Sequence, residues 1–129
     1  MAAECTYDYA IVRVVPRVDR GERINAGVIL SCADSDFLEA RIELDETALL
    51  AIDPGVDLDA VRTNLAAIMA ICRGGAEGGP IGRLPARGRF RWLVAPRSTM
   101  IQPSAVHTGR TADPPACLER LMDRLVRRP

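Results

Sequence analysis

The chain has 129 residues, of which 48% are hydrophobic, so we expect one compact domain with a buried core. Seventeen basic and seventeen acidic residues give no net charge, so we expect neither nucleic acid nor an anionic membrane as a partner. Every basic residue is arginine, which excludes Schiff-base chemistry on lysine and the lysine of a phosphate-binding P-loop.

The cysteines do not form a recognisable chemical motif. They lie far apart, without C-x-x-C spacing and with only one histidine to join them, so we expect no metal site, redox pair or cofactor. The better interpretation is four buried free thiols, Cys5, Cys32, Cys72 and Cys117. Because no apolar run approaches the roughly 20 residues that span a bilayer and the start does not read as an export signal, we expect a cytoplasmic protein.

Three strands are predicted in the first third of the chain. Residues 7–16 are almost continuously apolar and β-branched, which is typical of a strand in the middle of a sheet. A charged connection, residues 17–23, leads to a second apolar strand, in which Gly27 indicates a bulge or a close backbone contact. In residues 37–44 apolar and charged side chains alternate, so this strand should lie nearer the sheet edge with one face in water.

The rest of the chain predicts helices and one more strand. Asp45 should cap a short helix, and Asp57 a longer one whose apolar residues recur with the helical period. Residues 74–88 are rich in glycine and proline and predict a flexible loop. The alternation in residues 89–95 predicts a fourth strand, and Asp113 should open a last helix with an apolar stripe.

These elements together predict a fold class. We expect a single α+β domain over residues 1–129, in which a mainly antiparallel sheet of about four strands carries two main helices. The pattern does not specify the order of the strands.

The segment RSTMIQPSAVHTG, after the predicted fourth strand, holds most of the polar side chains that could perform chemistry. It contains Arg97, Ser98, Gln102, Ser104, the only histidine, His107, and Thr108. An arginine fork with hydroxyl, amide and backbone donors would suit a phosphate or a carboxylate. Alternatively, the serine and threonine side chains bond the turning backbone and the segment is architecture.

A second polar cluster lies between the first two strands. The stretch VPRVDRGERIN places Arg17, Glu22 and Asn25 close together in the sequence. Such charges usually form the solvated end of a hairpin. Asn25 is less ordinary, because an amide inside an apolar strand must find hydrogen-bond partners if it is buried. It either anchors the hairpin or faces a ligand.

Two blocks of the sequence resemble a known family. YDYAIVRVVPRVDRGERINAGVIL and FRWLVAPRSTMIQPSAVHTG are similar to the bacterial domain of unknown function 3037, over nearly the whole chain. The residues at the family's motif positions are Arg13, Glu22, Asn25, Gly27, Arg97, Ser98, Gln102, Ser104, His107, Thr108 and Gly109. The resemblance supplies no established reaction. It implies a genomic context, because such proteins are often encoded beside a protein with a HipA-like kinase fold.

Our leading hypothesis is a small binding or accessory protein rather than an enzyme. The connection around Arg17 to Asn25 and the segment from Arg97 to Thr108 would form a polar surface for a partner or an anionic ligand. The partner implied by the resemblance is the HipA-like kinase-fold protein, and an anionic small molecule or phosphopeptide is an alternative. We keep a homodimer as a further alternative.

The alternative hypothesis is a small hydrolase or transferase. His107 would be the general base, Ser98 or Ser104 the nucleophile, and Arg97 the clamp for an oxyanion or phosphate. In a third interpretation, Ser104 or Thr108 is phosphorylated by the kinase-like neighbour. Both interpretations require an accessible hydroxyl.

Overall fold

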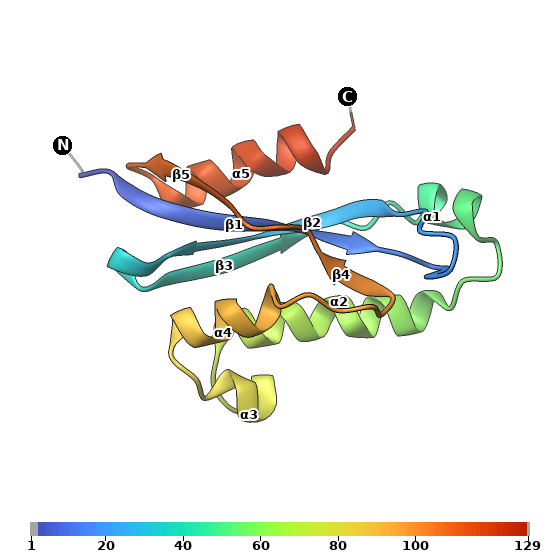
Figure 1. The fold of residues 1–129 in the computed structure, drawn as a ribbon, viewed down its shortest axis with the longest axis horizontal. Coiled ribbons are helices and arrows are strands. Elements are labelled where there is room, and N and C mark those ends of the chain that lie inside the picture. The colour runs from blue at the N-terminus through green and yellow to red at the C-terminus, as the bar shows by residue number, and fades with distance from the viewer. Residues whose placement is uncertain (1–2, 129) are drawn as a thin grey trace.

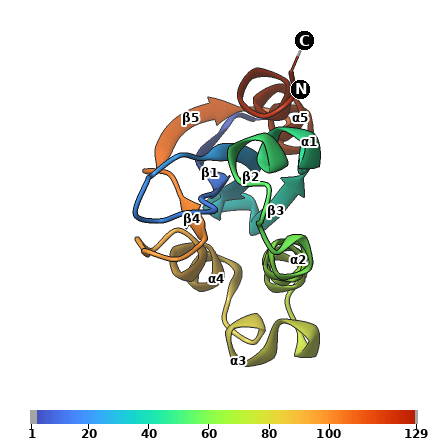
Figure 2. The same cartoon turned by 90° about the vertical axis from the view of Figure 1, so that its right-hand side faces the viewer.

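The computed structural model describes residues 3–128, which form a five-stranded antiparallel sheet with helices on both faces (Figures 1 and 2). The strands are β1 (Cys5–Val14), β2 (Ile24–Cys32), β3 (Phe37–Ile42), β4 (Ile101–Pro103) and β5 (His107–Thr111). Their order is β3-β2-β1-β4, and β5 also pairs with β1. The short strands β4 and β5 therefore share one edge, β1 is central and β3 is the other edge. The predicted α+β class, the central first strand and the third strand at the edge are confirmed.

Five helices lie within residues 3–128, and three of them begin at a capping aspartate. They are α1 (Glu46–Ile52), α2 (Leu58–Arg73), α3 (Gly79–Gly82), α4 (Ala86–Leu93) and α5 (Pro114–Leu125), with short 3-10 turns at Ala33–Ser35 and Ala76–Gly78. The side chains of Asp45, Asp57 and Asp113 each accept a hydrogen bond from a backbone N–H in the first turn of α1, α2 and α5. These caps satisfy N–H groups that have no partner within the helix. No helix within residues 3–128 is both long and apolar enough to cross a membrane.

The sheet separates two apolar clusters, and Figure 2 shows α5 on one side of it and α2 and α4 on the other. On one face, α2 and α4 cover the larger cluster, which includes Val12, Ile29 and Phe90. On the other face, α5 covers a smaller cluster around Leu30 and Leu118. A sheet that is apolar on both faces needs helices on both, and this explains why β1 and β2 read as continuous apolar runs.

The predicted strand over residues 89–95 is wrong, because residues 89–93 belong to α4 and the next two residues follow its end. Its buried residues Ala86, Phe90 and Leu93 are spaced as on one face of a helix, although neighbouring residues also alternate. Long-range contacts favour the helix, since the Arg89 side chain donates to the carbonyl oxygens of Ile71 and Cys72 at the end of α2. The place at the sheet edge is taken by β4 and β5 instead.

The segment over residues 74–88 was expected to be a loop, but it contains the second 3-10 turn, α3 and the start of α4. The Gly75 N–H donates to the Gly82 carbonyl and closes the segment on itself. Gly74 and Gly75 both have positive φ, a conformation that glycine adopts without strain. The glycines of this segment therefore allow sharp turns between short helical elements.

A bulge in β2 confirms the prediction made from Gly27. Val12 pairs with Gly27, but the next residue, Arg13, pairs with Asn25, so Ala26 is the extra residue. Gly27 itself approaches β3 so closely that a Cβ would overlap the Arg41 carbonyl oxygen. Because a bulge shifts the side-chain alternation by one, Asn25 points to the face that α5 occupies.

Candidate anion-binding site

Three polar residues lie in one row across the sheet: Arg13, Asn25 from the first polar cluster and Gln102 from the second. Arg13 on β1 is the direct partner of Asn25 on β2 and of Gln102 on β4. Residues paired in this way carry their side chains on the same face of a sheet. The helix on that face, α5, packs mainly on β2 and β3 and ends at Leu125. The polar row therefore lies beside and beyond the end of α5.

A pocket of about 460 Å³ opens at this place, and we call it the arginine pocket. Its lining comes from β1, β2, the end of α5 and the chain that follows: Arg13, Arg23, Ile24, Asn25, Asp45, Arg124, Leu125, Val126, Arg127 and Arg128. Five of these ten residues are arginines, and only one is acidic. Gln102 is not in the lining, and its Nε2 donates to the Thr99 carbonyl oxygen.

The five arginines differ in their partners. Arg127 forms ion pairs with Glu43, Glu119 and Asp123. Arg128 lies 3.8 Å from Asp45. Within the described residues, the side chains of Arg13, Arg23 and Arg124 have neither an ion pair nor a hydrogen bond, and they leave three positive charges uncompensated.

Arg13 is the most constrained of these three. Its Nε is buried and has no hydrogen-bond partner among residues 3–128. Burial, followed by the nearby charge of Arg23, lowers the pKa of the Arg13 guanidinium. A buried N–H without an acceptor is costly, because the desolvation of that group is not repaid. An anion in the pocket would supply both an acceptor and a compensating charge.

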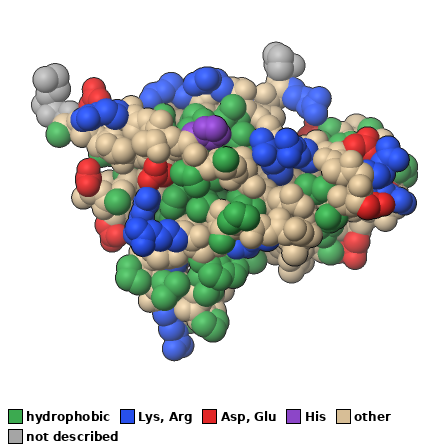
Figure 3. All heavy atoms as spheres, in the orientation of Figure 1, with side chains coloured by type: hydrophobic (Ala, Val, Ile, Leu, Met, Phe, Trp, Pro, Cys, Tyr) green, Lys and Arg blue, Asp and Glu red, His purple; other side chains and the backbone are tan. Residues whose placement is uncertain are grey.

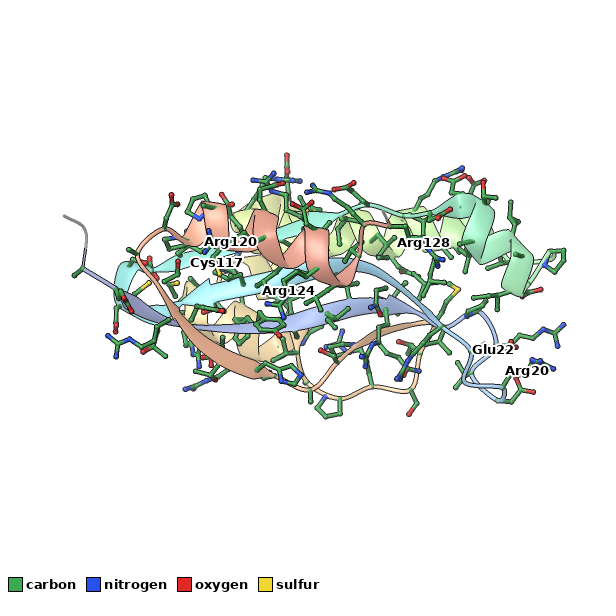
Figure 4. All side chains as sticks on the ribbon, turned by 90° about the horizontal axis from the view of Figure 1, so that it is seen from above. Arg20, Glu22, Cys117, Arg120, Arg124 and Arg128 are labelled. Atoms are coloured by element: carbon green, nitrogen blue, oxygen red, sulfur yellow. The ribbon has the colours of Figure 1, made fainter. Side chains whose placement is uncertain are left out.

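Charge is unevenly distributed around α5. On the side toward β3, Glu119 pairs with Arg41 and Arg127. Arg120 and Arg124 follow one another along the helix, and Arg128 lies on the chain just beyond its end, as Figure 4 shows. Figure 3 shows basic side chains gathered at the upper edge of the molecule, over α5. The neutral total charge of the chain therefore conceals a local basic surface.

Asn25 positions the end of α5 against the sheet. Its Nδ2 donates to the Leu125 carbonyl oxygen at 2.9 Å. Carbonyl groups in the last turn of a helix have no N–H partner within the helix, and this bond satisfies one of them. The bond joins β2 to α5 and keeps Arg124 near Arg13 on β1 and near Arg23, the residue before β2. Asn25 thus anchors the hairpin and also lines the pocket.

The charged tip of the β1–β2 connection lies outside the pocket. Glu22 accepts a hydrogen bond from the Arg20 side chain at 2.5 Å, and Figure 4 shows both residues at the outer end of the connection. Arg17 lies 3.9 Å from Asp53, next to α1. These contacts fit a solvated hairpin end.

Arg97 stands on the other side of the sheet, with α4. Its Nη2 donates to the Trp92 carbonyl oxygen and its Nε to that of Ala95, so it caps the end of α4. The guanidinium lies 4.6 Å from the centre of the Trp92 ring. The neighbouring Ser98 is exposed and makes no side-chain hydrogen bond among the described residues.

Ser104 has a structural role between β4 and β5. Its side chain is 6% exposed, and its Oγ accepts from the Ile11 N–H at 2.7 Å and donates to the Ala105 carbonyl oxygen at 2.8 Å. It therefore continues the pairing with β1 where the edge strand is interrupted. Because this hydroxyl is buried and already hydrogen-bonded, it is not exposed in the way that a nucleophile or a phosphate acceptor must be.

His107 and Thr108 are neighbours on β5 but face opposite sides of the sheet. The His107 ring lies 5.4 Å from that of Tyr9, and Figure 3 shows the histidine at the surface among hydrophobic side chains. No hydrogen bond joins His107 to a hydroxyl within the described part of the chain. The Thr108 hydroxyl donates to Asp8 at 2.6 Å.

Asp8 is the centre of a polar network that sequence reasoning missed. Its carboxylate accepts from Thr108 on β5 and from Arg87 on α4, and Arg87 also donates to Ser31 on β2. Burial opposes the charged form, but these hydrogen bonds and the charge of Arg87 outweigh it and lower the pKa of Asp8. The available signal was a carboxylate inside an otherwise apolar strand.

The pocket residue Arg124 was not predicted, and Arg23 lies within the polar stretch between the first two strands but was not singled out there. Arg124 had a weak signal, since Arg120 and Arg124 are four positions apart and lie on one side of the predicted last helix. Arg13 was identified only through its place in the family motif. Its role depends on the strand order, which brings β2 and β4 to its two sides.

Comparison with known proteins gives a family for this chain. The profile of the family described as "Protein of unknown function (DUF3037)" matches residues 9–126, which include β2, the β4–β5 edge and most of the arginine pocket. Comparisons with curated proteins and with solved structures found no match. Since the match spans nearly the whole described domain, the chain belongs to the DUF3037 family.

Proposed function

We propose that this protein is a binding module whose arginine pocket holds a phosphate group. The observation that carries the proposal is the set of three arginines, Arg13, Arg23 and Arg124, that surround a concave site without an acidic partner among the described residues. Arginine forks bind phosphate oxygens through parallel hydrogen bonds, and a buried Nε provides a donor that water cannot easily satisfy.

The charge of the pocket favours phosphate over a simple carboxylate. Three uncompensated cations exceed the single charge of a carboxylate, whereas a phosphomonoester carries about 1.5 to 2 negative charges at neutral pH. The end of α5 opposes an anion, but the helix dipole amounts to only about half a charge. The arginines therefore dominate the local electrostatics.

A protein could present such a group as well as a small molecule. The HipA-like kinase-fold neighbour that the family resemblance implies would generate phosphorylated side chains, and we propose a phosphorylated segment of that neighbour as the physiological source. The chemistry that both sources share is a terminal phosphate group. Parallel titrations with inorganic pyrophosphate and with a phosphoserine peptide from the neighbour distinguish a free phosphate from a peptide-borne one.

Calorimetric titration of the purified protein tests the pocket. We expect saturable pyrophosphate binding that weakens as salt rises, because exposed charges are screened. Arg13→Gln and Arg124→Gln should each weaken binding by about tenfold, which corresponds to about 1.4 kcal/mol. The matched control is Arg62→Gln, an exposed arginine on α2 whose partners are Glu46 and Asp59.

Two results would contradict the proposal. One is the absence of saturable binding to the wild-type protein with either phosphate probe. The other is an equal loss of affinity in Arg62→Gln and in the pocket variants, which would indicate a diffuse charge effect. Circular dichroism of each variant separates a loss of binding from a loss of fold.

A further inference from the structure

A second cavity, of about 290 Å³, opens on the opposite face of the sheet, and we call it the α2–α4 pocket. It is lined by α2, α4, the loop after α4 and the strands beneath them: Val12, Ile29, Asn64, Ala67, Ile68, Ile71, Trp92, Leu93, Arg97, Thr99, Met100, Ile101 and Pro103. It has no residue in common with the arginine pocket.

The floor of this cavity is part of the main apolar core. Val12 and Ile29 are each 1% exposed and also belong to the cluster that α2 and α4 cover. The walls are aliphatic apart from the Trp92 ring, and polar side chains come only from Asn64, Arg97 and Thr99. A concave site with apolar walls and a few polar groups is the usual form of a small-molecule site.

The polar part of the lining has one sign of charge. Among residues 3–128, Arg97 is the only charged residue that lines the cavity, and none of their acidic side chains lines it. The guanidinium is held in place by hydrogen bonds to the Trp92 and Ala95 carbonyl oxygens and by the Trp92 ring. These bonds use Nε and Nη2, and Nη1 has no partner among the described residues. The Thr99 hydroxyl, in contrast, already donates to Ile101.

We infer that the α2–α4 pocket binds a small amphipathic carboxylate, with its apolar body over Val12 and Ile29 and its carboxylate at Arg97. Apolar burial would supply most of the affinity, and the fixed arginine would select the charged end group. At about 30 Å³ per non-hydrogen atom, the share of a water molecule in the liquid, the cavity accommodates about ten such atoms. An eight-carbon carboxylate has this size.

The chain contains a built-in reporter for this site. Trp92 is the only tryptophan, lines the cavity and is 41% exposed. Octanoate should change its fluorescence in a saturable way. Octanamide has the same shape without the charge, and it should bind about tenfold more weakly because it lacks the ion pair with Arg97. Calorimetry with the same two probes checks that the optical change reports binding.

Variants separate the apolar and the charged parts of the interaction. Ala67→Phe places a large side chain into the cavity from an exposed position on α2 and should abolish binding of both probes. Ala66→Phe is the matched control, because Ala66 is also exposed on α2 but does not line this cavity. Arg97→Gln should lose the preference for octanoate over octanamide while octanamide still binds.

The outcomes decide the inference in either direction. No saturable response to octanoate, equal affinities for octanoate and octanamide in the wild type, or an equal effect of Ala66→Phe and Ala67→Phe would each overturn it. If Arg97→Gln does not fold, the wild-type ratio of the two affinities decides the role of the charge. Octanoate binding should persist in Arg13→Gln and Arg124→Gln, so this inference stands or falls independently of the proposed phosphate site.

Discussion

The Asn25 side chain donates a hydrogen bond to the backbone carbonyl oxygen of Leu125, 100 positions further along the chain. This bond fastens the end of α5 to β2 and forms one wall of the arginine pocket. The bulge at Ala26 is what turns Asn25 toward α5. Fold and site are therefore linked at this residue.

Asn25→Ala should reduce both stability and phosphate affinity. Loss of the partly buried hydrogen bond should lower the free energy of unfolding by about 1 kcal/mol, as measured by urea denaturation. Asn64→Ala, on the exposed side of α2, is the control and should change stability by less than about 0.5 kcal/mol. Equal effects of the two variants would mean that the bond does not anchor α5.

Ser104→Ala tests whether this serine is structural. It leaves the buried Ile11 N–H without an acceptor and should cost about 1–3 kcal/mol of unfolding free energy. Ser98→Ala removes an exposed hydroxyl without a described partner and should be nearly neutral. Thermal or urea unfolding measures both. A Ser104→Ala protein as stable as the wild type would refute the structural role.

Two glycine substitutions should have opposite effects. Gly27→Ala places a Cβ against the Arg41 backbone in β3, so we expect a loss of about 1–3 kcal/mol. Gly88→Ala lies inside α4, where the added Cβ meets only ordinary contacts, and should stabilise the protein by about 0.5–1 kcal/mol. Denaturation midpoints of the two variants give the comparison. If both substitutions changed the stability in the same direction, either the close approach at Gly27 or the helical assignment of α4 would be wrong.

The Asp8 network predicts a pH dependence of stability. Its folded-state pKa is lowered below the ordinary value of 3.8, so the unfolded state binds the proton more tightly. The stabilisation is therefore complete above the ordinary pKa and is lost as pH falls through the folded-state pKa.

Urea denaturation from neutral to acidic pH measures this dependence. The wild-type protein should lose more unfolding free energy on acidification than Asp8→Asn, which lacks the titrating group. Asp19→Asn, in the exposed β1–β2 connection, controls for the loss of one carboxylate. Identical pH profiles for wild type and Asp8→Asn would contradict the network.

Local patterns predicted the elements whose signals agree with one another. β1, β2 and β3 have strand periodicity and turn residues at their ends, and the aspartate caps mark the starts of α1, α2 and α5. The sequence of α4 fits both the alternation of a strand and the spacing of a helix. Its contact with the end of α2, through Arg89, joins residues far apart in the chain and cannot be predicted from the local sequence. The strands β4 and β5 are short and polar, and they form because the edge of β1 needs backbone partners.

The candidate site was predictable only in part. Asn25 could be singled out as an amide in an apolar strand, and the first of the two predicted polar clusters contributes Arg23 and Asn25 to the pocket lining. The row formed by Arg13, Asn25 and Gln102 depends on strand order, which periodicity does not contain. Arg124 enters the pocket because α5 crosses the sheet at a particular place and ends there. The tertiary packing, rather than the local sequence, therefore decides which arginines line the pocket without an acidic partner.

The most direct test of the central claim is to observe the arginine side chains while a phosphate compound binds. In NMR spectra of the isotope-labelled protein, the Nε–Hε signals of Arg13 and Arg124 should shift saturably with pyrophosphate, with a common affinity. The signals of Arg62 and Arg73, which lie on α2 across the sheet, should remain in place. Unchanged Arg13 and Arg124 signals, or equal shifts of all four, would contradict a phosphate site in the arginine pocket.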